Sequence, residues 1–144
     1  MSQLNFNTQF NYRPLLSGTN AHKTLTMPLP VIEVVISHSD LATTRLALID
    51  SGSTFSLFSR EVADELEIDV LKGRAEKLMS LGGPLLAYHH DVNIEITPDF
   101  RYHAEILFAE YSIPRNLFGH IGFFNHLTVS LRSRFGLIYL NSET

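Results

Sequence analysis

Apolar and β-branched residues of this chain fall in short runs separated by turn-forming residues, a pattern that predicts strands. The run "LTMPLPVIEVVIS" (25–37) has both of its prolines in the first half, as expected of an edge strand or a strand start. The turn "SDLAT" follows, and "RLALID" (45–50) is the next predicted strand. Because that strand is aliphatic almost throughout, we expect it to be buried on both faces.

One stretch replaces the strand pattern with helical spacing. In "SREVADELEI", Ser59 stands where an N-cap is expected and Glu61 lies in the first turn. Val62, Ala63 and Leu66 form an apolar stripe on one helical face. We therefore predict one short helix here.

A hairpin is predicted in the middle of the chain. Residues 75–97, "AEKLMSLGGPLLAYHHDVNIEIT", read as two strands, and "VNIEI" alternates between apolar and polar residues. Gly82 and Gly83 adopt positive φ without strain, so we expect the bend there. After a turn at Pro98 and Asp99, "FRYHAEILFAEY" continues the sheet.

The C-terminal third predicts further strands. The second half of "IPRNLFGHIGFFNHL" mixes glycine with large apolar residues and predicts a helical turn or a short helix. "TVSLRSRFGLIYL" predicts two short strands around a polar turn. The fold class is therefore expected to be all-β, with one or two short helices.

The N-terminal residues 1–23 differ in composition from the rest. They are rich in Asn, Gln, Ser and Thr and show no clear period, so we expect a flexible arm. Phe6, Phe10 and Tyr12 are the residues by which this arm would dock on a surface. Residues 24–144 are expected to form one domain.

Bulk composition excludes some functions. The net charge of −4 argues against a nucleic acid or an acidic membrane as partner. The chain has no cysteine, which rules out disulfides, thiolate metal sites and a cysteine nucleophile. No apolar run approaches the roughly 20 residues of a membrane span, and no secretory signal is evident. We expect a soluble, cytoplasmic protein.

The stretch "LALIDSGSTFS" contains the candidate chemistry. Asp50 ends a buried run, where a carboxylate is costly to desolvate unless it is hydrogen-bonded or used. The Ser51 hydroxyl is able to fix the loop, Gly52 lets a peptide backbone approach, and Ser53 is able to donate to the carboxylate. This arrangement is typical of an aspartic protease, although an Asx-type turn with only a structural role is the alternative.

The aspartic protease mechanism needs two carboxylates about 3 Å apart that share one proton. No other aspartate of this chain is followed by Ser-Gly or Thr-Gly, so the chain has half a site. A symmetric homodimer completes it, because residues near a two-fold axis face their own copies. We expect Asp50 to lie near such an axis.

Three segments in order resemble the retropepsin-type aspartic proteases, the single-domain, dimeric class that includes retroviral proteases. "ALIDSGSTFS" matches the family's hydrophobic–hydrophobic–Asp–Thr/Ser–Gly–Ala/Ser motif, and "MSLGGPLLAYHHDVNIEI" is similar to its glycine-tipped flap. "NLFGHIGFFNHLTVSL" resembles its second signature, an apolar–apolar–Gly sequence followed by a short helix. The resemblance implies a retropepsin-like acid-protease barrel of a single lobe over residues 24–144.

The resemblance also implies roles for particular residues. Asp50 is the catalytic acid and base, Ser51 grips the partner subunit's loop, and Gly52 contacts the substrate backbone. The implied flap residues are Ser80, Leu81, Gly82 and Gly83, and the implied supports of the catalytic turn are Leu117, Phe118 and Gly119. The chain departs from the family at His120, where the family usually has arginine, and at Pro84, which stiffens the flap.

A metal site is the main competing interpretation. "YHHD" places His89 and His90 side by side, but neighbouring strand residues point to opposite faces, so both cannot bind one ion. We expect solvated strand histidines, no metal and no cofactor. No nucleophile elbow of the G-x-S-x-G kind is present.

The sequence thus predicts a homodimeric aspartic endopeptidase acting on peptides or proteins at mildly acidic pH. Substrates with apolar side chains beside the scissile bond are expected, with Leu81, Leu85 and Ile113 as pocket residues. The alternatives are a catalytically inactive module of the same fold, which dimerises or binds peptides, and a monomeric interaction domain.

Overall fold

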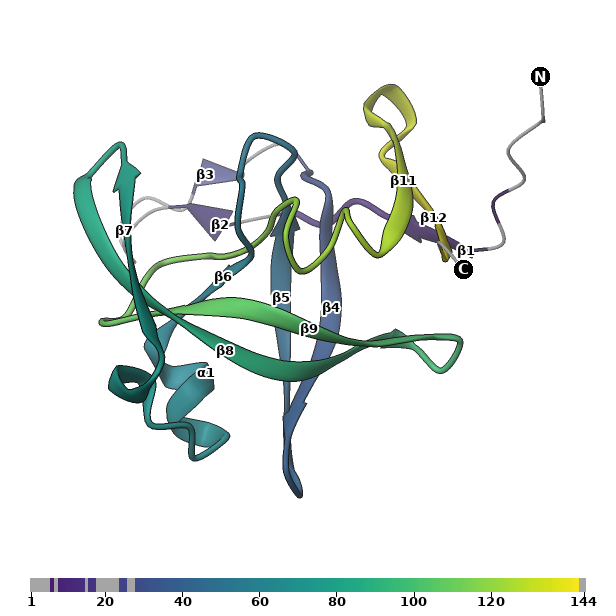
Figure 1. Cartoon of the computed structure of the whole chain (residues 1–144). Coiled ribbons are helices and arrows are strands. Elements are labelled where there is room, and N and C mark those ends of the chain that lie inside the picture. Colours follow the sequence, from purple (N-terminus) through teal and green to yellow (C-terminus); the bar gives the residue numbers. More distant parts are fainter. Residues whose placement is uncertain (1–5, 7, 15, 18–23, 26–27, 143–144) are drawn as a thin grey trace.

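The computed structural model of the chain describes residues 6, 8–14, 16–17, 24–25 and 28–142, which are mostly in strands (Figure 1). The strands are β1 (Thr8–Asn11), β2 (Leu16–Ser17), β3 (Thr24–Leu25), β4 (Val31–His38), β5 (Leu41–Ile49), β6 (Leu57–Phe58), β7 (Arg74–Ser80), β8 (Gly83–Thr97), β9 (Phe100–Ala109), β10 (Asn116–Phe118), β11 (Leu127–Arg132) and β12 (Leu137–Ser142). The helices are α1 (Arg60–Glu65) and the 3-10 turns η1 (Val70–Lys72) and η2 (Ser133–Phe135). In this part of the chain, no helix has the length and apolar character needed to cross a membrane.

Seven strands form the main sheet, in the order β4-β5-β10-β6-β9-β8-β7. β4 also pairs with β8, so the sheet closes on itself as a barrel. In Figure 1, β8 and β9 run together across β4 and β5. The interior is filled by large apolar side chains that are fully buried, among them Phe58, Phe108, Phe118 and Phe123. The all-β, single-lobe prediction is therefore confirmed.

β5 differs from the prediction that it is buried on both faces. Its side chains alternate, with Ala47 and Ile49 buried and Leu46 43% exposed. The reason is that a sheet wrapped around one core buries only its inner face. An aliphatic run is ambiguous on this point, because it fits both a two-sided and a one-sided strand.

The helix was correctly predicted, but its cap works differently from the expectation. Ser59 occupies the N-cap position without a capping hydrogen bond from its side chain. Its hydroxyl instead donates to Glu61 and accepts from the backbone N–H of Ile113 at 3.0 Å. The Ser59 hydroxyl therefore accepts an N–H from the distant Ile113 instead of one from the first turn of α1.

The segment that follows β10 is a series of hydrogen-bonded turns, so the short-helix alternative is wrong here. The N–H groups of Phe124 and Asn125 bond to the carbonyls of Gly119 and His120, five residues earlier. Gly122 has φ 97°, a left-handed conformation that interrupts a right-handed helix.

One strand near the N-terminus and two near the C-terminus form a separate three-stranded sheet in the order β1-β12-β11. β1 pairs antiparallel with β12, from Thr8 opposite Leu140 to Asn11 opposite Leu137. Phe10 and Tyr12 pack against the core. The structure therefore differs from the expected flexible arm over Thr8–Asn11, while residues 1–5, 7, 15 and 18–23 of that arm lie outside the described residues.

Candidate active site

Asp50 lies at the end of β5, on a turn held by backbone hydrogen bonds. Its N–H donates to the carbonyl of Phe118 at 2.9 Å, and its carbonyl accepts from the N–H of Ser53 at 3.1 Å. Its Oδ1 accepts the N–H of Gly52 at 2.9 Å. Asp50 is half-buried, whereas Ser51 and Gly52 are exposed. The carboxylate is therefore fixed at one oxygen and lies next to two exposed residues in the sequence.

Ser53 does not make the contact expected from the sequence. Its hydroxyl donates to the carbonyl of Phe55 at 2.7 Å, which closes the turn on itself. The donor to the Asp50 carboxylate is the N–H of Gly52. A hydrogen bond from a backbone N–H does not depend on the type of side chain. The sequence therefore pointed to the Ser53 hydroxyl rather than to the N–H of Gly52 as the donor.

β10 places the three predicted supporting residues directly behind this turn. It lies between β5 and β6, so Leu117 is paired with both Leu48 and Leu57. Gly119 follows, and a Cβ on it would stand 2.3 Å from the Phe55 carbonyl oxygen and 2.6 Å from that of Ser53. Only glycine fits a contact of two backbones this close.

Ser56 is a supporting residue that the sequence analysis missed. It is fully buried, and its hydroxyl accepts the N–H of Gly119 at 3.0 Å. Its own N–H donates to the carbonyl of Ile121 at 3.0 Å. A serine between Phe55 and two buried apolar residues was the available signal, because buried hydroxyls have hydrogen-bond partners.

The hairpin of β7 and β8 has the form of the predicted flap. Ser80 pairs with Gly83, so Leu81 and Gly82 form the bend, one residue earlier than expected. Only Gly83 of the two glycines has positive φ, at 111°. The Ser80 hydroxyl closes the bend by donating to the Gly83 carbonyl at 2.7 Å.

The inner face of this hairpin is apolar. Leu78 and Leu85 pack with Phe55 and Ile113 in one cluster. The buried members of the cluster are Leu57, Ala87, Leu107 and Ala109. Of the three predicted pocket residues, Leu85 and Ile113 therefore come together beneath the hairpin, whereas Leu81 is fully exposed at its tip.

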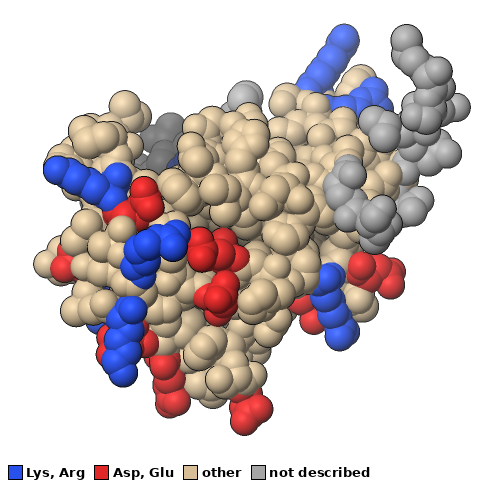
Figure 2. Space-filling view, in the orientation of Figure 1, with Lys and Arg blue, Asp and Glu red and all other residues tan. Residues whose placement is uncertain are grey.

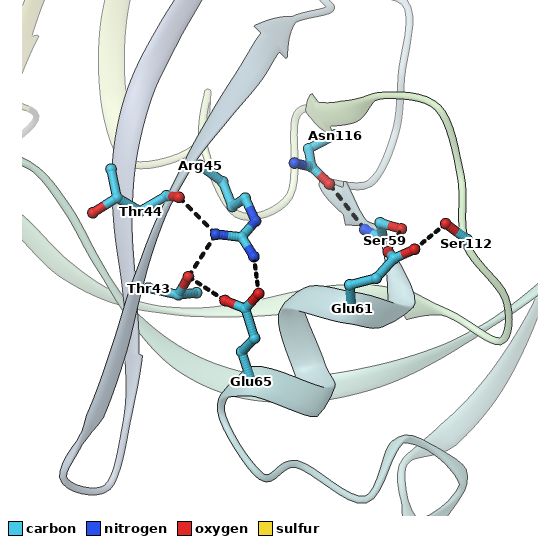
Figure 3. Close-up of polar contacts among 8 residues, drawn as sticks. All are labelled: Thr43, Thr44, Arg45, Ser59, Glu61, Glu65, Ser112 and Asn116. Carbon is cyan, nitrogen blue, oxygen red and sulfur yellow. Dashed lines mark hydrogen bonds and ion pairs between the residues drawn. The ribbon is translucent and has the colours of Figure 1, made fainter.

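Two polar clusters fix α1 and the segment that contains Ile113 (Figure 3). In one, Glu61 accepts from Ser59 and from Ser112; in the other, Arg45 pairs with Glu65, which also accepts from Thr43. The Asn116 side chain joins β10 to this region, accepting the N–H of Ser59 at 2.9 Å and donating to the Leu46 carbonyl at 3.1 Å.

The carboxylates of these clusters are biased toward the charged form. Hydrogen bonds from Ser112 and then Ser59 lower the pKa of Glu61, and bonds from Thr43 and then Arg45 lower the pKa of Glu65. Both glutamates lie at the surface, where solvent screening keeps the net contribution to stability small. Their role is to orient α1 against β5 and the segment before β10.

His120 occupies the position where the retropepsin resemblance leads us to expect arginine. Its Nε2–H donates to the carbonyl of Ser51 at 2.7 Å, and its backbone N–H donates to that of Ser53 at 2.9 Å. The ring packs against Phe124 with the centroids 5.1 Å apart. His120 therefore supports the turn that contains Asp50.

Replacing His120 with alanine is expected to loosen the turn and to lower kcat/KM by about threefold to tenfold, the scale of one lost hydrogen bond. His120→Gln retains an N–H donor and should recover part of the loss, while the melting temperature changes little in both. Steady-state kinetics and thermal unfolding measure the two effects. Equal kcat/KM for wild type and His120→Ala would contradict this role.

Comparisons with known proteins agree with this geometry. No protein-family model matches the chain, and no curated protein matches it. Among solved structures, a retropepsin-like aspartic protease from Rickettsia conorii is similar with a TM-score of 0.58 and 12% identity, covering 76% of this chain and 88% of that one. The EIAV protease in complex with the inhibitor HBY-793 is similar with a TM-score of 0.50 and 20% identity, covering 72% and 88%. The chain therefore has the fold of the retropepsin-like aspartic proteases.

Proposed function

We propose that this chain is an aspartic endopeptidase that acts as a homodimer, with one Asp50 from each subunit in a shared active site. The observation that carries this proposal is the Asp50 carboxylate, half-buried on a turn with several backbone hydrogen bonds. Phe55, in the loop that follows this turn, packs against the same buried cluster as Leu78 and Leu85 of the hairpin. The similarity to retropepsin-like aspartic proteases supports the same conclusion.

The proposed chemistry needs one of the two Asp50 carboxyls protonated and the other ionised. The ionised carboxylate takes a proton from a water as the water oxygen bonds to the peptide carbonyl carbon. The protonated carboxyl gives its proton to the carbonyl oxygen. When the C–N bond breaks, the first carboxyl gives the proton it took from the water to the nitrogen, which leaves as an amine, and the second carboxylate takes a proton from a hydroxyl of the diol, which becomes the carboxylic acid product. No metal or other cofactor is invoked.

The surface around the catalytic turn suits contact with a second copy. Ser51, Gly52 and His120 are exposed there, and the exposed Ile121 is held to the turn by its N–H, which donates to the Thr54 carbonyl at 2.8 Å. In the view of Figure 2, charged side chains gather over the lower part of the molecule, whereas the upper middle part, where β5 connects to β6, is largely uncharged. A surface with few charges is cheaper to desolvate in an interface.

Dimerisation predicts that specific activity depends on protein concentration. When the enzyme is diluted below the dimer dissociation constant, the rate per chain should fall, because monomers have half a site. Excess Asp50→Asn chains should also inhibit wild type by forming mixed dimers. Activity over a hundredfold dilution, with sedimentation velocity on the same samples, tests this. A monomer with constant specific activity would rule out the shared site.

An extended peptide is the substrate that the site suits. The cluster of Leu78, Leu85, Phe55 and Ile113 offers apolar contacts, and extended backbones pair readily with strands. The test is to incubate the protein with a diverse peptide library at several pH values and to compare wild type with Asp50→Asn by mass spectrometry. Cleavage by wild type alone supports the proposal, and no cleavage at any pH supports an inactive peptide-binding module.

A further inference from the structure

His89 is a buried histidine that the proposed chemistry does not use. Its side chain is 6% exposed, so the expectation of a solvated strand histidine is wrong at this position. His89 lies on β8, two residues from Ala87, and therefore on the face that packs beneath the flap hairpin. His90 faces the other way, and its Nε2–H donates to the Val70 carbonyl at 2.8 Å.

Two carboxylates meet the two ring nitrogens of His89. Nδ1 lies 2.8 Å from Glu105 on β9, and Nε2 lies 2.8 Å from Glu76 on β7. Ionised carboxylates only accept hydrogen bonds, and a neutral imidazole has a single N–H, so only the imidazolium donates to both. In that form His89 ties β7 to β9 across β8.

The remaining charges around His89 come from the same three strands. On β7, Arg74 approaches Glu105 at 3.6 Å. On β8, Asp91 is the residue opposite Glu105 in the β8–β9 register, and it lies 3.7 Å from His103 of β9. The charged groups of these strands around His89 are therefore Glu76, Glu105, Asp91 and Arg74.

His89 also contacts the loop that contains the catalytic turn. Its ring meets Phe55 edge to face, with the centroids 5.6 Å apart and an interplanar angle of 81°. The carbonyl of Phe55 accepts the Ser53 hydroxyl, and it is one of the atoms against which Gly119 packs. One imidazole thus joins the base of the hairpin to the segment that follows Asp50.

We propose that His89 is a positioning residue: as an imidazolium it bridges Glu76 and Glu105, holds the base of the flap against Phe55, and so favours peptide binding at acidic pH. The inference rests on the proposed aspartic protease function. β7 lies at the edge of the main sheet, bonded there to β8, so the bridge adds a second attachment for that strand. A neutral ring has one N–H, so one of the two bonds is lost and the tie between β7 and β9 is broken, while β7 stays paired with β8.

Hydrogen exchange of β7 tests this without any need for catalysis. In wild type, the amides of Arg74–Ser80 should exchange progressively faster than expected from intrinsic chemistry once the pH is high enough for the His89 ring to lose its proton. In His89→Gln they should exchange at least about fivefold faster at acidic pH, with little further pH dependence. His103→Gln removes an exposed histidine of β9 and should behave like wild type. Equal protection of β7 in wild type and His89→Gln would overturn the inference.

A second variant covers the case in which His89→Gln does not fold. Glu76→Gln retains the imidazole and an oxygen acceptor but removes one charge, and the pH dependence of exchange in β7 should weaken. An unchanged pH dependence in a folded Glu76→Gln protein would likewise overturn the bridge.

Kinetics on a peptide recovered from the library link the bridge to function. His89→Gln should raise KM about tenfold at acidic pH, the usual scale for one hydrogen bond to a charged group, with kcat nearly unchanged. A fall in kcat with unchanged KM would overturn the positioning role. If wild type cleaves no peptide, the proposed function fails, whereas the exchange experiment still decides on the bridge.

Discussion

Asp50→Asn is expected to lower kcat for peptide hydrolysis by about 10³-fold or more, since both carboxylates of the shared site are lost at once. The asparagine Oδ1 is still able to accept the N–H of Gly52, which donates to Asp50 Oδ1 at 2.9 Å in the native turn. The turn should therefore keep its fold, and the melting temperature and dimer dissociation constant should stay close to those of wild type. Kinetics, thermal unfolding and sedimentation on the same preparations measure the three quantities.

The matched control is Asp99→Asn. Asp99 is an exposed carboxylate in the turn between β8 and β9, and its loss should leave hydrolysis within about twofold of wild type. A statine-type peptide inhibitor should bind wild type and block it. If Asp50→Asn retains full activity while wild type cleaves, the chemistry lies elsewhere in the chain. If neither protein cleaves but the inhibitor binds, the inactive peptide-binding module is the better account.

The parts of the fold that the sequence predicted correctly are those decided by local patterns. The alternation of residues in β8, the short helix after Ser59 and the hairpin around Gly83 each follow from neighbours within a few residues. The turn at Asp50 was predicted for the same reason, because Asp50 is followed directly by Ser51 and Gly52.

The parts that were missed depend on contacts between distant segments. The apolar neighbours of Ser56 indicate that its hydroxyl has a partner, but they do not indicate that this partner is the N–H of Gly119, 63 residues later. The composition of the N-terminal arm suggested flexibility, yet Thr8–Asn11 are stabilised by pairing with β12, the last strand of the chain. His89 looked like a surface histidine because Glu76 and Glu105 come from other strands.

Several long-range contacts converge on the loop from Asp50 to Ser56. β10 and Gly119 support it from behind, and His120 donates a hydrogen bond to the Ser51 carbonyl. Phe55 packs against the apolar cluster beneath the β7–β8 hairpin and contacts the His89 ring. A carboxylate in a solvent-exposed turn is common, whereas one whose loop is fixed from several elements is pre-organised for chemistry. This convergence favours the catalytic interpretation of Asp50 over an Asx-type turn with only a structural role.

Gly119→Ala tests the packing of Gly119 against the loop from Asp50 to Ser56, and we expect a large effect. The new Cβ would stand 2.3 Å from the Phe55 carbonyl oxygen and 2.6 Å from that of Ser53, and both are backbone atoms that cannot rotate away. β10 and the catalytic loop must separate, which strains the bonds from Gly119 to Ser56 and from His120 to Ser53. We expect the free energy of unfolding to fall by about 3 kcal/mol or more and peptide cleavage to be lost.

Gly82→Ala provides the contrast, because both variants add one methyl group to a glycine. At Gly82 the nearest atom to a new Cβ is the Ser80 hydroxyl oxygen, at 3.8 Å, and the backbone is outside the left-handed region. Urea unfolding should therefore place Gly82→Ala within about 1 kcal/mol of wild type. Equal stability of the two variants would show that Gly119 is not in tight contact with the backbone of Ser53 and Phe55. The argument that this contact pre-organises the Asp50 loop would then fail.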